Sequence, residues 1–118
     1  IQTVKTLAEA AAITFGGKAE VAVKEQYKNM KPALDRHPEV VGFLKDSYRA
    51  AGVEPESVPI RGGTDGSRLT EMGIPCPNIF TGGHNFHGRY EWVSLDQMSL
   101  AADVLINLAQ KITEHKTE

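Results

Sequence analysis

"PIRGGTDGSRLTEMGIPCPNIFTGGHNFHG", residues 59–88, holds most of the chain's 11 glycines and decides the fold. An apolar segment leads into each of its two glycine blocks: VPI, residues 58–60, precedes the first, and CPNIF, residues 76–80, precedes the second. Short apolar runs bounded by glycine and proline are typical of buried strands. The residues between them predict a short helix that closes at Gly73.

Two further predicted helices frame this region. Pro38 suits the first turn of a helix whose apolar side chains recur at helical spacing, and Gly52 ends it. Ser94 and Gln97 have the spacing of a capping box at the start of a long amphipathic helix that runs to the end of the chain. The order helix, strand, helix, strand, helix predicts an α/β fold in which helices cover a parallel-type sheet.

The N-terminal part of the chain is predicted to be a separate unit. Apolar residues at helical spacing predict a helix over residues 1–12, which Gly16 and Gly17 stop. Alternation in AEVAVKE predicts a half-buried strand at residues 19–25. A proline-bearing connection then separates both elements from the helix that begins at Pro38.

Composition narrows the class of protein. The chain has 118 residues, 41% hydrophobic and 24% charged, which is typical of one soluble globular domain. A net charge of −2 gives no electrostatic case for binding nucleic acid or an anionic membrane, and no apolar run approaches the ~20 residues of a membrane span.

Cys76 is the single cysteine, so we expect a buried, inert thiol and a reducing, cytoplasmic location. The first residues, IQTVKTLAEAAA, lack the pattern expected of a secretory signal. Because residue 1 is not methionine, we expect the chain to be cut from a longer protein.

The first glycine block carries an anion-binding pattern. Gly62 and Gly63 leave backbone N–H groups unobstructed, Thr64 or Asp65 can cap the following helix, and Arg61 offers a planar fork for a carboxylate. A substrate carboxylate or a developing tetrahedral oxygen would suit such a site. A tight strand-to-helix turn that binds nothing explains the same glycines equally well. The spacing matches neither a P-loop nor a dinucleotide fingerprint.

The second glycine block carries His84 and His87, with Glu91 close behind. Imidazole and carboxylate groups bind zinc, but these histidines lack the spacing of a zincin helix, and a zinc finger would need more cysteines. Two loop histidines without a metal are the simpler interpretation. A catalytic zinc needs about three protein ligands, and no complete set follows from this sequence.

The stretch PIRGGTDGSRLTEMGIPCPNIFTGGHNFHGRYEWVSLDQM resembles the C-terminal segment of the peptidase T family. This family is the aminotripeptidase branch of the co-catalytic two-zinc exopeptidases. The resemblance continues through the final helix and reaches back through YKNMKPALDRHPEVV to the start, so it covers nearly the whole chain. The pair of motifs R-G-G-T-D-G and T-G-G-x-N-x-H-G at this spacing is highly specific.

The resemblance implies a parent protein of two domains. A catalytic α/β domain would carry two zinc ions, and a lid inserted within it would form a dimer and close over a short peptide substrate. Residues 1–30 would be the last helix and strand of that lid and dimerisation domain. Residues 31–118 would be the C-terminal part of the catalytic domain.

The resemblance also implies roles for individual residues. His87 matches a zinc ligand, and Asn85 lies beside it at the substrate. Glu91 stands where related enzymes often have a glutamate, which would orient a ligand. His84 replaces a tyrosine and is not assigned as a ligand. The loop that faces the substrate in the family matches Arg61, Gly62, Gly63 and Thr64.

The catalytic glutamate and the remaining metal ligands of the family would lie before Ile1. The parent would release the N-terminal residue from tripeptides, whereas the isolated chain is expected to be inactive and to self-associate or to rearrange its first 30 residues. A non-catalytic module that binds an anion or a peptide, or serves in assembly, is an alternative. A small metal-binding protein that uses His84, His87 and a carboxylate is another.

Overall fold

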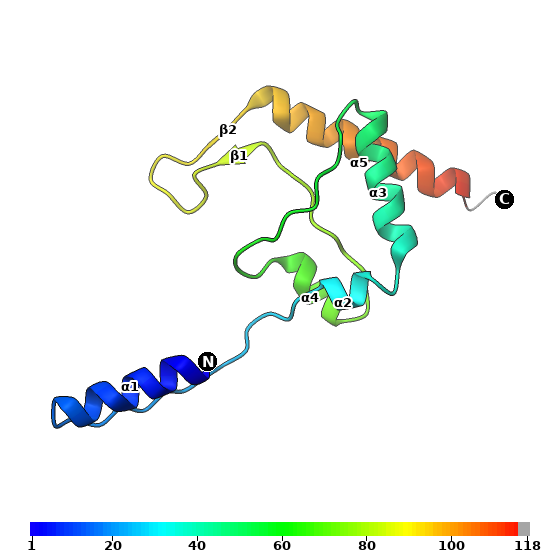
Figure 1. Cartoon of the computed structure of the whole chain (residues 1–118). Helices are drawn as coiled ribbons and strands as arrows, with labels where there is room; N and C mark the ends of the chain where they lie inside the picture. Colours follow the sequence, from blue (N-terminus) through cyan, green and yellow to red (C-terminus); the bar gives the residue numbers. More distant parts are fainter. Residues whose placement is uncertain (116–118) are drawn as a thin grey trace.

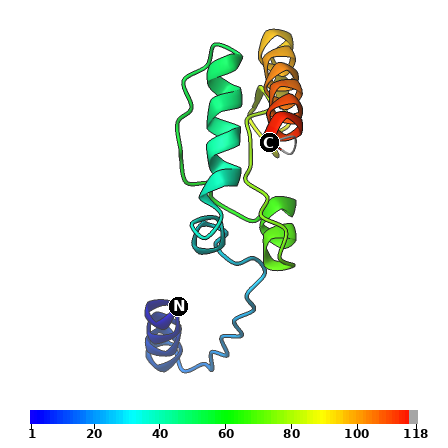
Figure 2. The ribbon, with the colours of Figure 1, turned by 90° about the vertical axis from the view of Figure 1, so that its right-hand side faces the viewer.

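The computed structural model describes residues 1–115 and shows an elongated molecule with a detached N-terminal helix (Figures 1 and 2). Its radius of gyration is 20.1 Å and its extents are 67 × 36 × 20 Å. A compact domain of this length would have a radius of gyration of about 13.5 Å. The excess arises because α1 stands clear of the body that the other helices form.

Helix α1 (Gln2–Thr14) confirms the predicted N-terminal helix, and none of its residues is buried. The predicted strand at residues 19–25 is wrong, because the chain from Gly17 to Asn29 has no regular secondary structure. A strand exists only where a neighbouring strand completes its backbone hydrogen bonds. No such neighbour lies beside this segment among residues 1–115.

The body of the molecule is built on α3 (Pro38–Ala50) packed against α5 (Leu95–His115), with α2 (Lys31–Leu34) below them. Val104 and Ser47 are fully buried where the two long helices meet. The buried Ser47 hydroxyl is satisfied because it donates to the Phe43 carbonyl oxygen at 2.7 Å. The buried apolar residues are few: Leu34, Leu44, Ala101 and Val104.

Helix α4 (Asp65–Glu71) follows the first glycine block as predicted, and Gly73 ends it with φ +93°. Thr64 is the N-cap, since its Oγ1 accepts a hydrogen bond from the Ser67 amide at 3.2 Å. Cys76, just beyond, is half-buried rather than fully buried as expected. Its amide donates to Thr70 Oγ1 at 3.0 Å, which ties the chain back to α4.

The predicted strands at residues 58–60 and 76–80 are not strands in the structure, and residues 1–115 contain no parallel sheet. The one sheet in the described part of the chain pairs β1 (Gly83–His84) with β2 (Trp92–Val93) in antiparallel register. Among the described residues, no strand lies beside either predicted segment to complete a ladder. The alternating order of helices is therefore correct, and the sheet between them is missing.

Only one of the two hydrogen bonds of the predicted capping box forms at the start of α5. The Gln97 amide lies 3.4 Å from Ser94 Oγ, which is the first half of a capping box. The Gln97 side chain does not return to Ser94; its Oε1 lies 3.1 Å from His84 Nε2 instead. The Ser94 amide donates to the Gly82 carbonyl at 3.0 Å. These bonds fasten the second glycine block to the N-terminal end of α5.

Candidate functional site

The first half of the candidate site is the loop of residues 61–64, which leads into α4. Gly62 has φ +106°, a conformation that L-residues rarely adopt, and a Cβ there would meet nothing within 4 Å. Gly63 has no such backbone requirement, but a Cβ there would overlap atoms of the Tyr27 ring. The Arg61 side chain is exposed. Two adjacent glycines are thus needed for different reasons, one for its backbone and one for its neighbour.

Tyr27 belongs to the connection between α1 and α2, and the sequence did not identify it as a site residue. The Arg68 guanidinium carbon lies 5.0 Å from the centre of the Tyr27 ring, within the range of a cation–π contact. The neighbouring Lys28 Nζ lies 2.9 Å from Glu71 Oε1. This hydrogen bond to Glu71 and the charge of the same carboxylate raise the pKa of the Lys28 ammonium.

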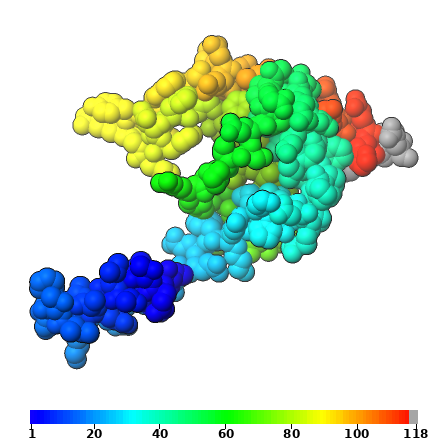
Figure 3. Space-filling view, in the orientation of Figure 1, coloured from blue at the N-terminus to red at the C-terminus, as the bar shows by residue number. Residues whose placement is uncertain are grey.

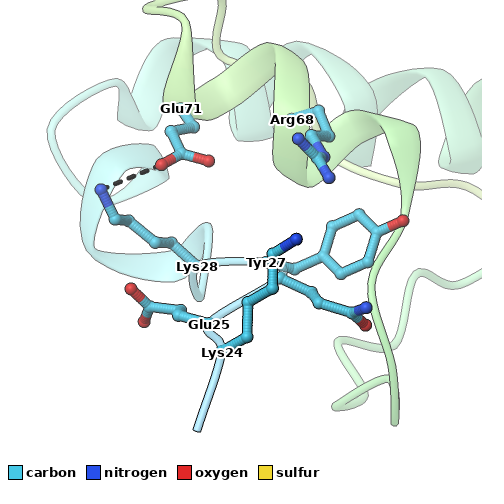
Figure 4. Close-up of a pocket in the computed structure, with 7 residues that line it drawn as sticks. Lys24, Glu25, Tyr27, Lys28, Arg68 and Glu71 are labelled. Atoms are coloured by element: carbon cyan, nitrogen blue, oxygen red, sulfur yellow. Dashed lines mark ion pairs between the residues drawn. The ribbon is translucent and has the colours of Figure 1, made fainter. Parts of the chain in front are cut away.

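A shallow pocket of about 300 Å³ lies between this connection and α4 (Figure 4). Its walls come from residues 24–28 on one side and from Arg68 and Glu71 of α4 on the other. Polar and charged groups dominate its lining, so it has no apolar floor that would bind a hydrophobic ligand. The pocket marks where the connection is fastened to α4, close to the 61–64 loop.

The second half of the candidate site is the 83–93 hairpin, which carries the second glycine block. Asn85 and His87 both have left-handed backbones, with φ +55° and +63°. The Gly88 amide donates to the Asn85 carbonyl at 2.9 Å, and a Cβ on Gly88 would lie 2.8 Å from that oxygen. Left-handed conformations of residues other than glycine cluster at functional sites. The turn holds His87 exposed near the tip of the hairpin.

Asn85 and Glu91 take part in the same turn. The Asn85 side-chain amide donates to the Tyr90 carbonyl at 3.4 Å, and the Glu91 backbone amide donates to the Gly88 carbonyl at 3.2 Å. The side chains of Asn85 and Glu91 are both exposed. These bonds stabilise the backbone around His87 and leave the Glu91 carboxylate to the solvent.

His84 lies at the base of the hairpin, where it contacts side chains rather than solvent alone. Its ring stacks on Trp92 with centroids 4.1 Å apart and an angle of 16° between the planes. Its Nε2 faces Gln97 Oε1 at 3.1 Å. These contacts give His84 a structural position between β2 and α5. They do not favour the alternative in which His84, His87 and a carboxylate bind a metal together.

The two halves of the site lie on the same side of the body, away from the C-terminal end of α5 (Figures 1 and 3). The space-filling view shows open space between the 61–64 loop and the 83–93 hairpin. Among residues 1–115, no three His, Cys, Asp or Glu side chains are grouped so that they could hold a metal ion. In the same range no helix is long and apolar enough to cross a bilayer.

These features belong to a known class of protein. The pattern of peptidase family M20/M25/M40 matches residues 3–111, and the chain belongs to this family. The resemblance noted from the glycine and histidine blocks is thereby confirmed. A peptidase fold with several helices and a small sheet describes the structure of residues 1–115.

Curated relatives that match the chain are named Peptidase T. That of Vibrio cholerae serotype O1 (strain ATCC 39315) is 48% identical over 99 residues, which is 84% of this chain and 24% of the relative. That of Caldanaerobacter subterraneus subsp. tengcongensis is 44% identical over 108 residues, 91% of this chain and 26% of the relative. That of Shewanella pealeana is 47% identical over 100 residues, 85% of this chain and 25% of the relative. The chain therefore spans about a quarter of the length of the curated relatives it matches.

Proposed function

We propose that the chain is the C-terminal part of a two-zinc aminopeptidase that releases the N-terminal residue from tripeptides. Residues 31–118 belong to its catalytic domain, and residues 1–30 belong to an inserted lid that forms a dimer. The observation that carries this proposal is the left-handed turn at His87, in a chain that matches the M20 family from residue 3 to residue 111. The relatives are named Peptidase T, which supports peptidase activity for the longer protein.

His87 is the residue that we assign to a metal ion. Its imidazole is a good donor for zinc, and the turn presents it to the exterior, where ligands from the rest of the parent protein can meet it. Asn85 holds the turn through Tyr90, and the Glu91 carboxylate is free to orient the imidazole. When bound, a metal pair would supply Lewis-acid activation of water and of the scissile carbonyl.

The 61–64 loop binds the peptide in this proposal. Arg61 carries an exposed guanidinium, which suits a peptide carboxylate or the oxygen of the cleaved carbonyl. Because the Thr64 hydroxyl caps the helix, Thr64 contributes to substrate binding through its backbone. Gly62 provides unobstructed backbone beside Arg61. Gly63 remains exposed although the Tyr27 ring lies against it.

Exposed apolar side chains support the view that more of the protein covers this chain. Val58 and Ile60, on the extended path before Arg61, are 63% and 58% exposed. Val4 and Leu7 on α1 are 60% and 65% exposed. In the parent protein, we place residues 58–60 within a sheet and α1 in the dimer interface of the lid. The unpaired Cys76 supports a cytoplasmic location.

The decisive experiment replaces His87 in the parent protein. His87→Asn removes the imidazole, while asparagine still tolerates the left-handed backbone. We expect a loss of one zinc ion per active site and a fall in tripeptide turnover of at least about a thousandfold. His37→Asn is the matched control, since His37 is an exposed histidine paired with Glu39 on another element. Unchanged zinc content and turnover in His87→Asn would overturn the proposal.

The isolated 118-residue chain provides the complementary test. Because it carries a single assigned ligand, we expect no tripeptide turnover even with excess zinc. Robust turnover by the isolated chain would contradict the proposed division of the site. Tight binding of a peptide without cleavage by the parent protein would instead favour a non-catalytic module.

A further inference from the structure

The contact between Tyr27 and Gly63 lies outside the residues that the proposed function assigns. Tyr27 precedes α2, and Gly63 lies 36 positions later in the 61–64 loop. The ring covers one face of the Gly63 backbone so closely that an added Cβ would overlap its Cγ, Cδ2 and Cε2 atoms. Because Gly63 has an ordinary φ, the ring is the reason that this position has no side chain.

Two further contacts hold Tyr27 in this place (Figure 4). The Arg68 guanidinium lies over the ring at 5.0 Å from its centre, and Arg68 belongs to α4, which the 61–64 loop precedes. The adjacent Lys28 pairs with Glu71 of the same helix at 2.9 Å. Tyr27 and Lys28 therefore fasten the connection to α4 at two points about one helical turn apart.

We propose that Tyr27 is a positioning residue for the 61–64 loop. Its ring, held by Arg68 against Gly63, sets the backbone conformation in which Arg61 and its neighbours meet the peptide substrate. This inference rests on the proposed function, which places the substrate at that loop. It also gives the first 30 residues a physical route to the site, because a displacement of the connection moves the ring that supports the loop.

A double-mutant cycle in the parent protein tests this contact. Tyr27→Ala removes the ring, and Gly63→Ala expels it, so each variant disturbs the same contact. We expect each to raise KM for a tripeptide by roughly ten- to a hundredfold, since small displacements of binding groups are costly, with a smaller change in kcat and no change in zinc content. The double variant should be about as impaired as either single variant. Additive effects in the double variant would overturn the proposal.

Two controls separate the ring contact from other effects. Tyr27→Phe keeps the ring and should retain a KM close to that of the unmodified protein. A KM as high as that of Tyr27→Ala would overturn the assignment to the ring. Gly62→Ala disturbs the same loop through its own backbone, and nothing lies within 4 Å of its added Cβ. Its effect should therefore add to that of Tyr27→Ala.

The outcomes distinguish this inference from the proposed function. A merely structural role for Tyr27 would lower the thermal midpoint of Tyr27→Ala and leave KM of the folded fraction unchanged, which overturns the inference alone. If the unmodified parent protein does not cleave tripeptides, the proposed function fails. In that case the double-mutant cycle is measured by the thermal midpoints of the variants. Non-additive changes in midpoint would support the contact between Tyr27 and Gly63, and additive changes would overturn it. If Tyr27→Ala does not fold, Arg68→Met takes its place. This substitution keeps a long side chain without the charge, and it should raise KM by part of the factor expected for Tyr27→Ala.

Discussion

The 61–64 loop and the 83–93 hairpin are both rich in glycine, yet they distribute their unusual backbone differently. In the loop, the left-handed conformation falls on Gly62, beside the exposed Arg61. In the hairpin, it falls on Asn85 and His87 themselves. Left-handed residues other than glycine cost free energy and persist only where the surroundings impose them. The difference indicates that the loop takes its left-handed conformation at little cost through a glycine, whereas the hairpin imposes a costly one on its histidine.

Their neighbours differ as well. The hairpin is anchored to α5 through Gly82, where a Cβ would lie 2.7 Å from Gln97 Cβ and 2.9 Å from the Met98 amide. The loop is held by one half-exposed ring from a connection without regular structure. The following predictions test this contrast in the parent protein, from the largest expected effect to the smallest.

Gly82→Ala should destabilise the hairpin most. The residue is buried with φ +80°, and its Cβ would collide with the backbone of α5, so strain and overpacking act together. We expect the free energy of unfolding to fall by about 2–4 kcal/mol, measured by urea denaturation. Gly17→Ala is the control, because its Cβ meets nothing within 4 Å and its φ is not positive. Equal effects of the two substitutions would show that the hairpin is not anchored as described.

Gly62→Ala should have a smaller effect on stability. Its cost is backbone strain alone, since no atom lies within 4 Å of the added Cβ. We expect a loss of about 1–2 kcal/mol in the free energy of unfolding. Gly42→Ala, in the middle of α3, should instead stabilise the protein by about 0.5–1 kcal/mol, because alanine favours a helix interior. A Gly62→Ala variant as damaging as Gly82→Ala would show that the loop is as tightly packed as the hairpin.

Thr64→Ala removes the cap that orients α4 after the loop. Its Oγ1 accepts from the Ser67 amide at 3.2 Å, and without the hydroxyl that amide would keep only its 3.0 Å bond to the Thr64 carbonyl oxygen. We expect a loss of about 1 kcal/mol in the free energy of unfolding. Thr64→Ser keeps the acceptor and should stay within about 0.5 kcal/mol of the unmodified protein. If both variants behave alike, the hydroxyl does not stabilise the helix.

The smallest effect concerns pH and the ion pair that holds the connection. Pairing with Glu71 raises the folded-state pKa of Lys28 above the ordinary value of 10.5. The stabilising contribution is therefore complete below the unfolded-state pKa and is lost as the pH rises through the folded-state pKa. The thermal midpoint should therefore decline above about pH 10, in small part because Lys28 loses its proton. Lys28→Gln should remove that small part of the decline. Lys45→Gln, on α3, is the control and should leave the decline unchanged.

Local structure was largely predictable. The helix that begins at Pro38, the Thr64 cap and the stop at Gly73 follow from capping chemistry and spacing, which depend on residues a few positions apart. The motif that contains His87 also identified the family. The strand predictions at residues 58–60 and 76–80 were wrong because an apolar extended run becomes a strand only beside a partner.

What the sequence by itself determined is the order of helices α1, α3, α4 and α5, the positions where glycine is placed and the family to which the chain belongs. It missed the short helix α2, which lies in the segment predicted to be a connection. The tertiary structure alone revealed that Gly63 is bare because of Tyr27 and that His84 is held by Trp92 and Gln97. The physical reason is the separation along the chain over which each interaction acts. Caps and helical spacing act between near neighbours in the chain, whereas a ring placed on a distant backbone depends on packing that no local pattern encodes.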